Sequence, residues 1–228
     1  MMFSSLFAFL ALSTSQAGDH DPFVSKRRKM VDEQIIQRGV SDKKVIDAML
    51  KVNRHLFVPE ADRSFSYEDY PLSIGYGQTI SQPYIVAFMT QAAHLMPSDK
   101  ILEIGTGSGY QAAILAEMAR EVYTIEIIKP LAESAEKRLK ELGYKNIFVK
   151  PGDGYEGWKE YAPFDVILLT AAPSEIPEKL VAQLKEGGRM IAPIGSFFQE
   201  LYLITKTSTG GLDKKRLLPV RFVPMVKE

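Results

Sequence analysis

Short apolar runs and amphipathic segments alternate along the central part of the chain. The short runs predict buried β-strands, and the segments whose apolar residues recur every three to four positions predict helices. In chain order, the pattern predicts helix 83–95, strand 101–104, helix 110–119, strand 122–126, helix 130–142, strand 147–149, strand 164–170, helix 176–186 and strand 189–193. Because strands that alternate with helices are joined by right-handed crossovers, we expect an α/β fold with a doubly wound, mostly parallel sheet.

The two ends of the chain follow other patterns. From residue 26 to about residue 52 the apolar spacing is helical, and Ser41 is the expected N-cap of a second helical segment. Near the C-terminus, apolar runs at 201–204 and 220–223 flank a polar loop and predict a closing antiparallel pair of strands. We therefore expect a Rossmann-like sheet with N-terminal helices and a C-terminal antiparallel strand pair.

Residues 54–82 interrupt this regularity with prolines, glycines and scattered aromatic residues. They predict a long irregular connection, and connections of this length are often functional. The segment ends in GYGQTISQP, residues 75–83, directly before a predicted helix. By spacing alone, Ser81 is an N-cap for that helix, with Pro83 in its first turn where a missing N–H is tolerated.

Composition narrows the chemistry that the chain can perform. Lys and Arg together number 28, as do Asp and Glu, so the net charge is zero and a nucleic-acid partner is not indicated. The absence of cysteine excludes thiol catalysis, cysteine-bound metals and disulfides. The three histidines lack metal-ligand spacing, so we expect no metal.

The first residues form a separate apolar extension. Residues 1–17, MMFSSLFAFLALSTSQA, are too few to span a membrane, so no stable membrane insertion is expected. Their ending, Ser15-Gln16-Ala17, fits a signal-peptidase site, but the usual basic opening is missing. An export signal and an extended start both stay open. We assign residues 1–25 to this extension and residues 26–228 to a single domain.

Glycines and acidic residues follow three successive predicted strands. The first strand runs into EIGTGSG, residues 103–109, whose glycines let the backbone approach a ligand; the second ends at Glu126; the third is followed by PGDG, residues 151–154. Ligands of open α/β sheets bind beyond the carboxyl ends of the strands. A carboxylate such as Glu126 can accept from both hydroxyls of a ribose, while Asp153 either accepts from an adenine amino group or holds a turn. Together the three ends predict a nucleoside pocket.

The glycine spacing discriminates among nucleoside cofactors. The chain has G-x-G-x-G over residues 105–109, which departs from the dinucleotide fingerprint, and no Lys-Ser or Lys-Thr follows as a P-loop requires. S-adenosylmethionine carries a ribose and an adenine but no phosphate, so it suits acidic strand ends better. A dehydrogenase that binds NAD stays as a weaker alternative.

Several motifs resemble known enzymes. LEIGTGSGYQAA, with VYTIE and GDG after it, resembles the binding core of class I S-adenosylmethionine-dependent methyltransferases. GYGQTISQP, PFDVILLTAAP, GGRMIAPIG and VRFVPMV closely resemble the protein-L-isoaspartate O-methyltransferase family from about residue 26 to the C-terminus, with Met225 where Leu is common. The resemblance implies methyl transfer to the α-carboxylate of L-isoaspartyl residues in damaged proteins and peptides, which starts repair through a succinimide.

The resemblance also implies roles for individual residues. Ser81 would contact the substrate carboxylate or the reacting centre, and Thr79 and Ile80 would form the wall beside the methyl donor. Val223 and Pro224 would border the peptide groove, the alternative being a final edge strand. The remaining cofactor-binding residues would be Glu103, Gly105, Thr106, Gly107, Gly109, Glu126, Asp153 and Gly154. Glu103 either binds the methionyl ammonium group through water or only orders the loop.

Other functions stay open on sequence alone. A methyltransferase for another acceptor and a non-catalytic module that binds S-adenosylmethionine or damaged peptides are the two alternatives. We expect a cytoplasmic enzyme, because the methyl donor is made and kept in the cytoplasm. The alternative is an exported or periplasmic enzyme, if residues 1–17 are a cleaved signal peptide.

Overall fold

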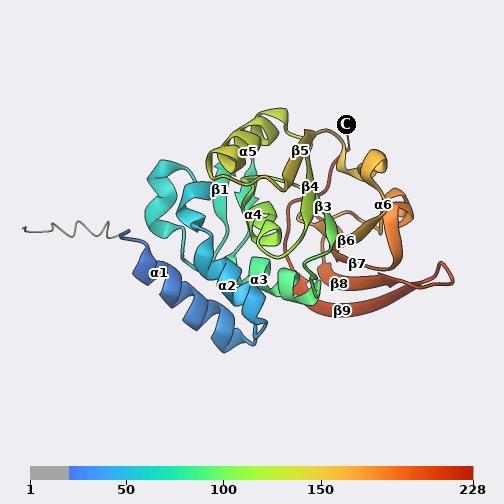
Figure 1. Ribbon diagram of the computed structural model, residues 1–228, viewed down its shortest axis with the longest axis horizontal. Helices are drawn as coiled ribbons and strands as arrows, with labels where there is room; N and C mark the ends of the chain where they lie inside the picture. The colour runs from blue at the N-terminus through green and yellow to red at the C-terminus, as the bar shows by residue number, and fades with distance from the viewer. Residues whose placement is uncertain (1–20, 228) are drawn as a thin grey trace, which may run out of the picture.

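The computed structural model describes residues 21–227, and a seven-stranded sheet runs through its centre (Figure 1). Its order is β5-β4-β3-β6-β7-β8-β9; the first five strands in this order are parallel, and β8 and β9 are antiparallel to their neighbours. The strands are β3 (Lys100–Ile104), β4 (Glu121–Glu126), β5 (Ile147–Pro151), β6 (Phe164–Leu169), β7 (Leu184–Ile194), β8 (Gln199–Lys206) and β9 (Leu212–Val220). The expected α/β class, with its closing antiparallel strands, is confirmed.

The central strands are buried on both faces, which explains their continuous apolar runs. Successive side chains of a strand point to opposite faces of the sheet. Ile101 of β3 and Val122 of β4 accordingly belong to one buried cluster, whereas Leu102 and Tyr123 belong to another. The sheet thus separates two apolar layers, and the carboxyl ends of its parallel strands lie side by side along one edge.

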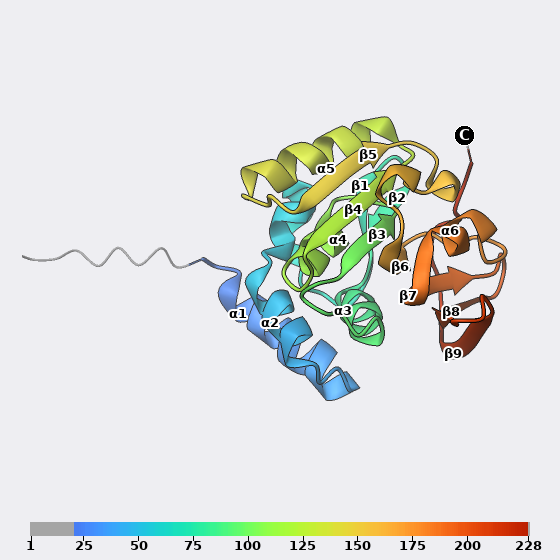
Figure 2. The same cartoon turned by 45° about the vertical axis from the view of Figure 1, so that its right-hand side comes forward.

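Helices cover the two faces unequally. The helices are α1 (Val24–Lys29), α2 (Lys43–Lys51), α3 (Pro83–Ala92), α4 (Tyr110–Ala116), α5 (Lys129–Glu141) and α6 (Glu178–Gln183), with a π-helical turn η1 (Met30–Ile35) and a 3₁₀ turn η2 (Ile36–Arg38) after α1. Buried residues of α2 to α5 share the first cluster, and Leu180 of α6 lies in the second. Figures 1 and 2 show α1 and the β8–β9 pair on opposite sides of the molecule.

The segment over residues 54–82 is more ordered than the sequence predicts. It contains the 3₁₀ turns η3 (Arg54–Phe57) and η4 (Glu60–Phe65) and a hairpin of β1 (Leu72–Gly75) and β2 (Gln78–Ile80). Tyr76 and Gly77 both have positive φ, 53° and 69°, as a two-residue hairpin turn of type I′ requires. The expectation of an irregular connection is therefore wrong for this hairpin.

Two predicted N-caps are also wrong. The side chain of Asp42, not Ser41, accepts the N–H of Lys44 (2.8 Å) at the start of α2. Helix α3 begins after Gln82 with no side-chain cap, so Ser81 does not cap it. The side chain of Ser81 is therefore not engaged by the first turn of its own helix.

Several element boundaries differ from the prediction as well, and two of them bear on the site. The helix predicted over 176–186 ends at Gln183, because Leu184 already pairs with Phe164 of β6. The last strand covers 212–220 rather than 220–223, because Val220 pairs with Gln199 at the very start of β8. The chain beyond Val220 leaves the edge of the sheet, and its residues line the cavities described below.

Among residues 21–227, no helix combines the length and the apolar character that a membrane crossing needs. The apolar segment 1–17, with its signal-peptidase pattern, lies outside the described residues.

Candidate functional site

Two cavities meet at the carboxyl edge of the parallel strands. The first, here the glycine cavity, has a volume of about 220 Å³ and is lined by the ends of β3, β4 and β6, by the β1–β2 hairpin and by the C-terminal segment 223–226. The second, here the serine groove, has about 480 Å³ and is lined by Ser81 and by residues 219–223, among others. Thr79 and Thr170 line both spaces. A ligand in one cavity therefore lies next to a ligand in the other.

The position of the cavities follows from the order of the strands. Chain connections from β3 lead to β4 on one side, while β6 lies on its other side, so the order reverses between β3 and β6. Such a switch point leaves a crevice beyond the strand ends. Gly105 follows β3 and Thr170 follows β6, which places both residues at this crevice.

The turn after β3 is shaped by glycine. Gly105 has φ +99°, and a Cβ atom at this residue would collide with Oγ1 of Thr170. The same hydroxyl donates to the backbone carbonyls of Gly105 (2.6 Å) and Ile104 (3.0 Å). Gly107 also has positive φ, and Gly109, the residue before α4, packs against Leu139. The bare backbone of the turn therefore faces the glycine cavity in one fixed conformation.

Glu126 connects the ends of two strands. Its Oε2 accepts the N–H of Gly107 (2.8 Å) and its Oε1 accepts the N–H of Ile128 (3.0 Å). The residue is buried, 5% exposed, yet it lines the glycine cavity. Because a carboxylate offers about four acceptor sites, two of them stay available to a ligand.

Glu103 lies behind the glycine turn rather than on the cavity wall. Its Oε2 accepts a hydrogen bond from the hydroxyl group of Thr124 (2.5 Å). The hydroxyl group of Thr124 also lies 2.7 Å from that of Thr106. Its Oε1 has no hydrogen-bond partner among the described residues. Complete burial, with the negative charge of Glu126 as a further cause, raises the pKa of Glu103 to about 8. A cation close to the free Oε1 would favour the ionised form of this carboxyl group.

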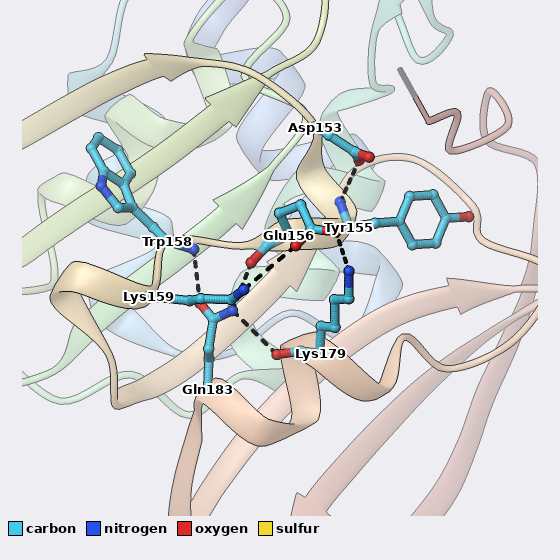
Figure 3. Close-up of polar contacts among 7 residues, drawn as sticks. All are labelled: Asp153, Tyr155, Glu156, Trp158, Lys159, Lys179 and Gln183. Atoms are coloured by element: carbon cyan, nitrogen blue, oxygen red, sulfur yellow. Dashed lines mark hydrogen bonds and ion pairs between the residues drawn. The ribbon is translucent and has the colours of Figure 1, made fainter.

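The end of β5, the third of the strand ends predicted to bind a ligand, is followed by a turn that Asp153 stabilises. Asp153 accepts the N–H of Tyr155 (2.8 Å), which is the turn-holding arrangement that the sequence left open. Figure 3 shows how the following segment is attached to α6: Gln183 accepts the N–H of Trp158 (2.7 Å) and donates to the carbonyl of Glu156 (2.8 Å). Lys179 of α6 adds an ion pair with the side chain of Glu156.

This attachment fixes Gly154, which lines the glycine cavity. A Cβ atom at Gly154 would collide with Ile104, so the backbone lies directly against the end of β3. The third strand end thus contributes backbone to the cavity, while the carboxylate of Asp153 lies away from the lining.

A buried arginine supports the Ser81 segment. Arg54 is 0% exposed; its Nη2 donates to the carbonyl of Ser81 (2.7 Å) and its Nε donates to the carbonyl of Ser66 (2.7 Å). Its guanidinium carbon lies 4.9 Å from the centre of the Tyr110 ring. No acidic side chain pairs with it among residues 21–227, and its Nη1 has no partner there. Burial lowers the pKa of Arg54 to about 10, which leaves it positive at neutral pH.

The C-terminal segment closes both spaces. The N–H of Ala172 donates to the carbonyl of Val223 (2.9 Å), and the N–H of Met225 donates to the carbonyl of Ala172 (2.8 Å). Val223 and Pro224 therefore run alongside the segment after β6, and both line the glycine cavity. Val223 also lines the serine groove.

The structure brings most of the predicted site residues together. Around the glycine cavity lie Thr79, Gly105, Gly107, Glu126, Gly154, Val223 and Pro224. Ile80, Ser81 and Thr106 surround a smaller space of about 40 Å³ beside it. Glu103, Gly109 and Asp153 lie behind these linings. In the described range, no three His, Cys, Asp or Glu side chains are grouped as a metal site.

Sequence reasoning missed two residues of the site. The sequence pattern predicts Thr170 only as the end of a strand, although a polar residue that ends an apolar run such as FDVILLT is a signal at the carboxyl end of a strand. Arg54, between apolar residues in VNRHLFVP, carries no local signal for its contact with Ser81, which lies 27 positions away.

Comparisons with known proteins agree on one family. Residues 25–228 match the family described as protein-L-isoaspartate(D-aspartate) O-methyltransferase. The protein-L-isoaspartate O-methyltransferase of a Picosynechococcus species is 56% identical over 205 residues, which cover 90% of this chain and 92% of the relative. The enzyme of the same name from Opitutus terrae is 52% identical over 227 residues, covering 99% and 97%.

Solved structures give the same result for the fold. A protein-L-isoaspartate O-methyltransferase superposes with a TM-score of 0.79 at 33% identity, over 87% of this chain and 65% of that chain. A putative protein-L-isoaspartate O-methyltransferase from Plasmodium falciparum, solved in complex with S-adenosyl-L-homocysteine, superposes with a TM-score of 0.78 at 30% identity, over 89% and 99%.

Proposed function

Because the chain belongs to the protein-L-isoaspartate(D-aspartate) O-methyltransferase family, we propose that its glycine cavity holds S-adenosylmethionine and that its serine groove holds the L-isoaspartyl acceptor. The chain is a protein-L-isoaspartate O-methyltransferase that depends on S-adenosylmethionine. One observation carries the assignment of the two spaces: Thr79 and Thr170 line both, so donor and acceptor meet between these two hydroxyl side chains.

The residues around the glycine cavity fit the donor. The two free acceptor sites of Glu126 suit the hydroxyls of a ribose, and the bare backbone at Gly105 and Gly107 allows close approach. The unpartnered Oε1 of Glu103, behind this turn, is free to bind a methionyl ammonium group through water, and the positive charge of that group would favour loss of the Glu103 proton. Thr106 and Gly109 hold the turn, and Gly154 with Asp153 forms the side that we assign to the adenine.

S-adenosylmethionine supplies a methyl group attached to a positively charged sulfur. The acceptor carboxylate is already ionised at neutral pH, so the reaction needs no strong general base. The residues of the chain therefore have to bind the two reactants, align them and exclude water. The methyl ester formed can collapse to a succinimide, whose hydrolysis returns some normal aspartate.

In this proposal the hydroxyl group of Ser81 donates a hydrogen bond to the acceptor carboxylate. The side chain is half-buried, lines the serine groove and is not used as a helix cap. Arg54 acts as a positioning residue, because it holds the carbonyl of Ser81 through a buried hydrogen bond. Ile80 anchors the same segment in the core, and Val223 borders the acceptor. Pro224, which the sequence also assigns to the acceptor, lines the glycine cavity instead.

The neutral net charge supports protein and peptide acceptors over nucleic acid. We further propose that residues 26–228 act as one domain and that the enzyme works in the cytoplasm, where its methyl donor is made. N-terminal sequencing of the native protein tests this location, since a mature chain that begins at Gly18 would indicate export.

The test of the function is methyl transfer to a matched pair of peptides. One peptide contains L-isoaspartate and the other contains L-aspartate at the same position, and both are incubated with S-adenosylmethionine that carries a labelled methyl group. Base-labile label on the isoaspartyl peptide alone is the expected result. Label on neither peptide, with S-adenosylmethionine still bound, would direct the search to another acceptor.

A further inference from the structure

Two adjacent phenylalanines project into solvent from the loop between β7 and β8. Phe197 is 98% exposed and Phe198 is 93% exposed, whereas the next most exposed large apolar side chain in the described range, Tyr76, reaches 63%. Residues 195–198, Gly-Ser-Phe-Phe, are here called the aromatic turn. Adjacent apolar side chains that are left in water mark sites of interaction, because their burial against a partner is favourable.

The aromatic turn is held in place at both ends. The N–H of Gly195 donates to the carbonyl of Pro173 (3.0 Å), in the segment that follows β6. Gly195 has φ +125°, and a Cβ atom there would collide with the carbonyl of Phe198, so the turn is tight. The exposure of the two rings is therefore a property of a fixed turn and not of a loose end.

The same turn is attached to the wall of the serine groove. Gln199 directly follows the two phenylalanines; its Nε2 donates to the carbonyl of Phe222 (3.0 Å), and its Oε1 accepts the N–H of Phe222 (2.6 Å). Phe222 itself lines the groove. Gln199, which holds Phe222 in the groove wall, is thus the residue directly after the aromatic turn.

A polypeptide acceptor must continue past this wall. The groove, at about 480 Å³, has the size of a site for a small ligand and can enclose only a short piece of chain. An extended chain advances about 3.3 Å per residue, so residues a few positions from the isoaspartyl group come level with the rim. The aromatic turn carries no charged side chain, so the partner that it suits is apolar.

We propose that Phe197 and Phe198 form a second contact for the acceptor, binding apolar side chains that flank the isoaspartyl residue outside the serine groove. This inference rests on the proposed acceptor position. Apolar side chains are mostly buried in a folded protein and become available when a segment unfolds. The contact therefore gives the enzyme a preference for damaged segments that are unfolded and apolar over those that are polar.

The test uses three isoaspartyl peptides. A six-residue peptide stays within the groove, and two fifteen-residue peptides extend beyond it, one with Leu and Phe in its flanks and one with Ser at the same positions. Steady-state kinetics are measured for the wild type, for the double variant Phe197→Ser/Phe198→Ser and for the apolar control Phe197→Leu/Phe198→Leu. Phe148→Ser, at the opposite edge of the sheet on β5, removes another exposed ring as a matched control.

We expect the double serine variant to raise the KM for the apolar long peptide about tenfold, which corresponds to about 1.4 kcal/mol, with kcat unchanged. The six-residue peptide and the Ser-flanked peptide should keep their constants, and the leucine and Phe148→Ser variants should resemble the wild type. Equal KM values for the two long peptides in the wild type would overturn the proposal.

Two other results would overturn it in distinguishable ways. If the wild type is a dimer in sedimentation, and the serine variant is a monomer with unchanged kinetics, the aromatic turn binds a second copy of the chain instead. If the wild type methylates none of the three isoaspartyl peptides, the proposed acceptor itself is wrong. If the wild type methylates the six-residue peptide and has equal KM values for the two long peptides, only the proposed role of the aromatic turn is rejected.

Discussion

Arg54 and Ser81 are joined by a hydrogen bond of 2.7 Å from a fully buried guanidinium to a backbone carbonyl. No carboxylate neutralises this guanidinium in the described part of the chain, which is unusual because buried charges are normally paired. Its favourable contacts are two carbonyls and the face of Tyr110. The positive charge therefore lies under the segment that we assign to the acceptor carboxylate.

We expect Arg54→Lys to lower kcat and to leave the dissociation constant of S-adenosylmethionine within about twofold. An ammonium group keeps the charge but cannot reach two carbonyls with the planar geometry of a guanidinium. The loss of one charged hydrogen bond, about 1.5–3 kcal/mol, predicts a decrease of roughly ten- to a hundredfold in kcat if the bond acts on the transition state.

A double-mutant cycle distinguishes positioning from general stability. If Arg54 acts through Ser81, the effects of Arg54→Lys and Ser81→Ala on kcat should be clearly less than additive. Additive effects, with cofactor binding lowered as well, would assign Arg54 a purely structural role.

Ser81→Ala should reduce kcat by roughly ten- to a hundredfold, because the acceptor carboxylate loses a hydrogen bond of about 1–3 kcal/mol. Binding of S-adenosylmethionine, measured by calorimetry, should stay nearly constant, since Ser81 does not line the glycine cavity. Ser73→Ala, an exposed serine on the neighbouring strand β1, is the matched control. Equal turnover in the wild type and Ser81→Ala would remove Ser81 from the reaction.

The succession of strands and helices along the chain and the edge of the sheet that carries the site could be predicted from the sequence, because both follow from local patterns. Each strand and helix has its own period, and parallel strands necessarily bring their carboxyl ends to one edge. Glu126 and Gly105 reach the same cavity for this reason alone.

Other features depend on contacts between distant residues. The strands of the β1–β2 hairpin have four and three residues, too few for a clear alternation, and Tyr76 adopts a positive φ that few residues other than glycine show. Thr170 bonds to carbonyls more than 60 positions away, and Arg54 reaches Ser81 across the hairpin. No local pattern in the sequence marks such contacts.

Glu126→Gln should weaken the binding of S-adenosylmethionine by roughly ten- to a hundredfold. An amide offers one acceptor oxygen in place of two, so it cannot serve Gly107 and Ile128 and still accept from two ligand hydroxyls. Glu121→Gln, at the start of the same strand and away from the cavity, should bind as the wild type does. An unchanged dissociation constant in Glu126→Gln would contradict the assigned ribose contact.

The pKa of Glu103, raised from about 4.5 to about 8, makes the free energy of unfolding depend on pH. Between these values the folded protein holds a proton on Glu103 that the unfolded chain has released. The folded state therefore binds more protons, and this group's contribution to stability decreases as the pH rises from about 4.5 to about 8. The slope can reach at most about 1.4 kcal/mol per pH unit and vanishes above the folded-state pKa.

Glu103→Gln should remove this decrease, because an amide stays neutral at every pH. Urea unfolding of the wild type and of Glu103→Gln, without S-adenosylmethionine, should therefore give a difference in unfolding free energy that shifts in favour of the variant from pH 5.5 to pH 7.5. A difference between wild type and Glu103→Gln that is independent of pH would mean that Glu103 is already ionised in the folded enzyme, with a cation or water at its free oxygen.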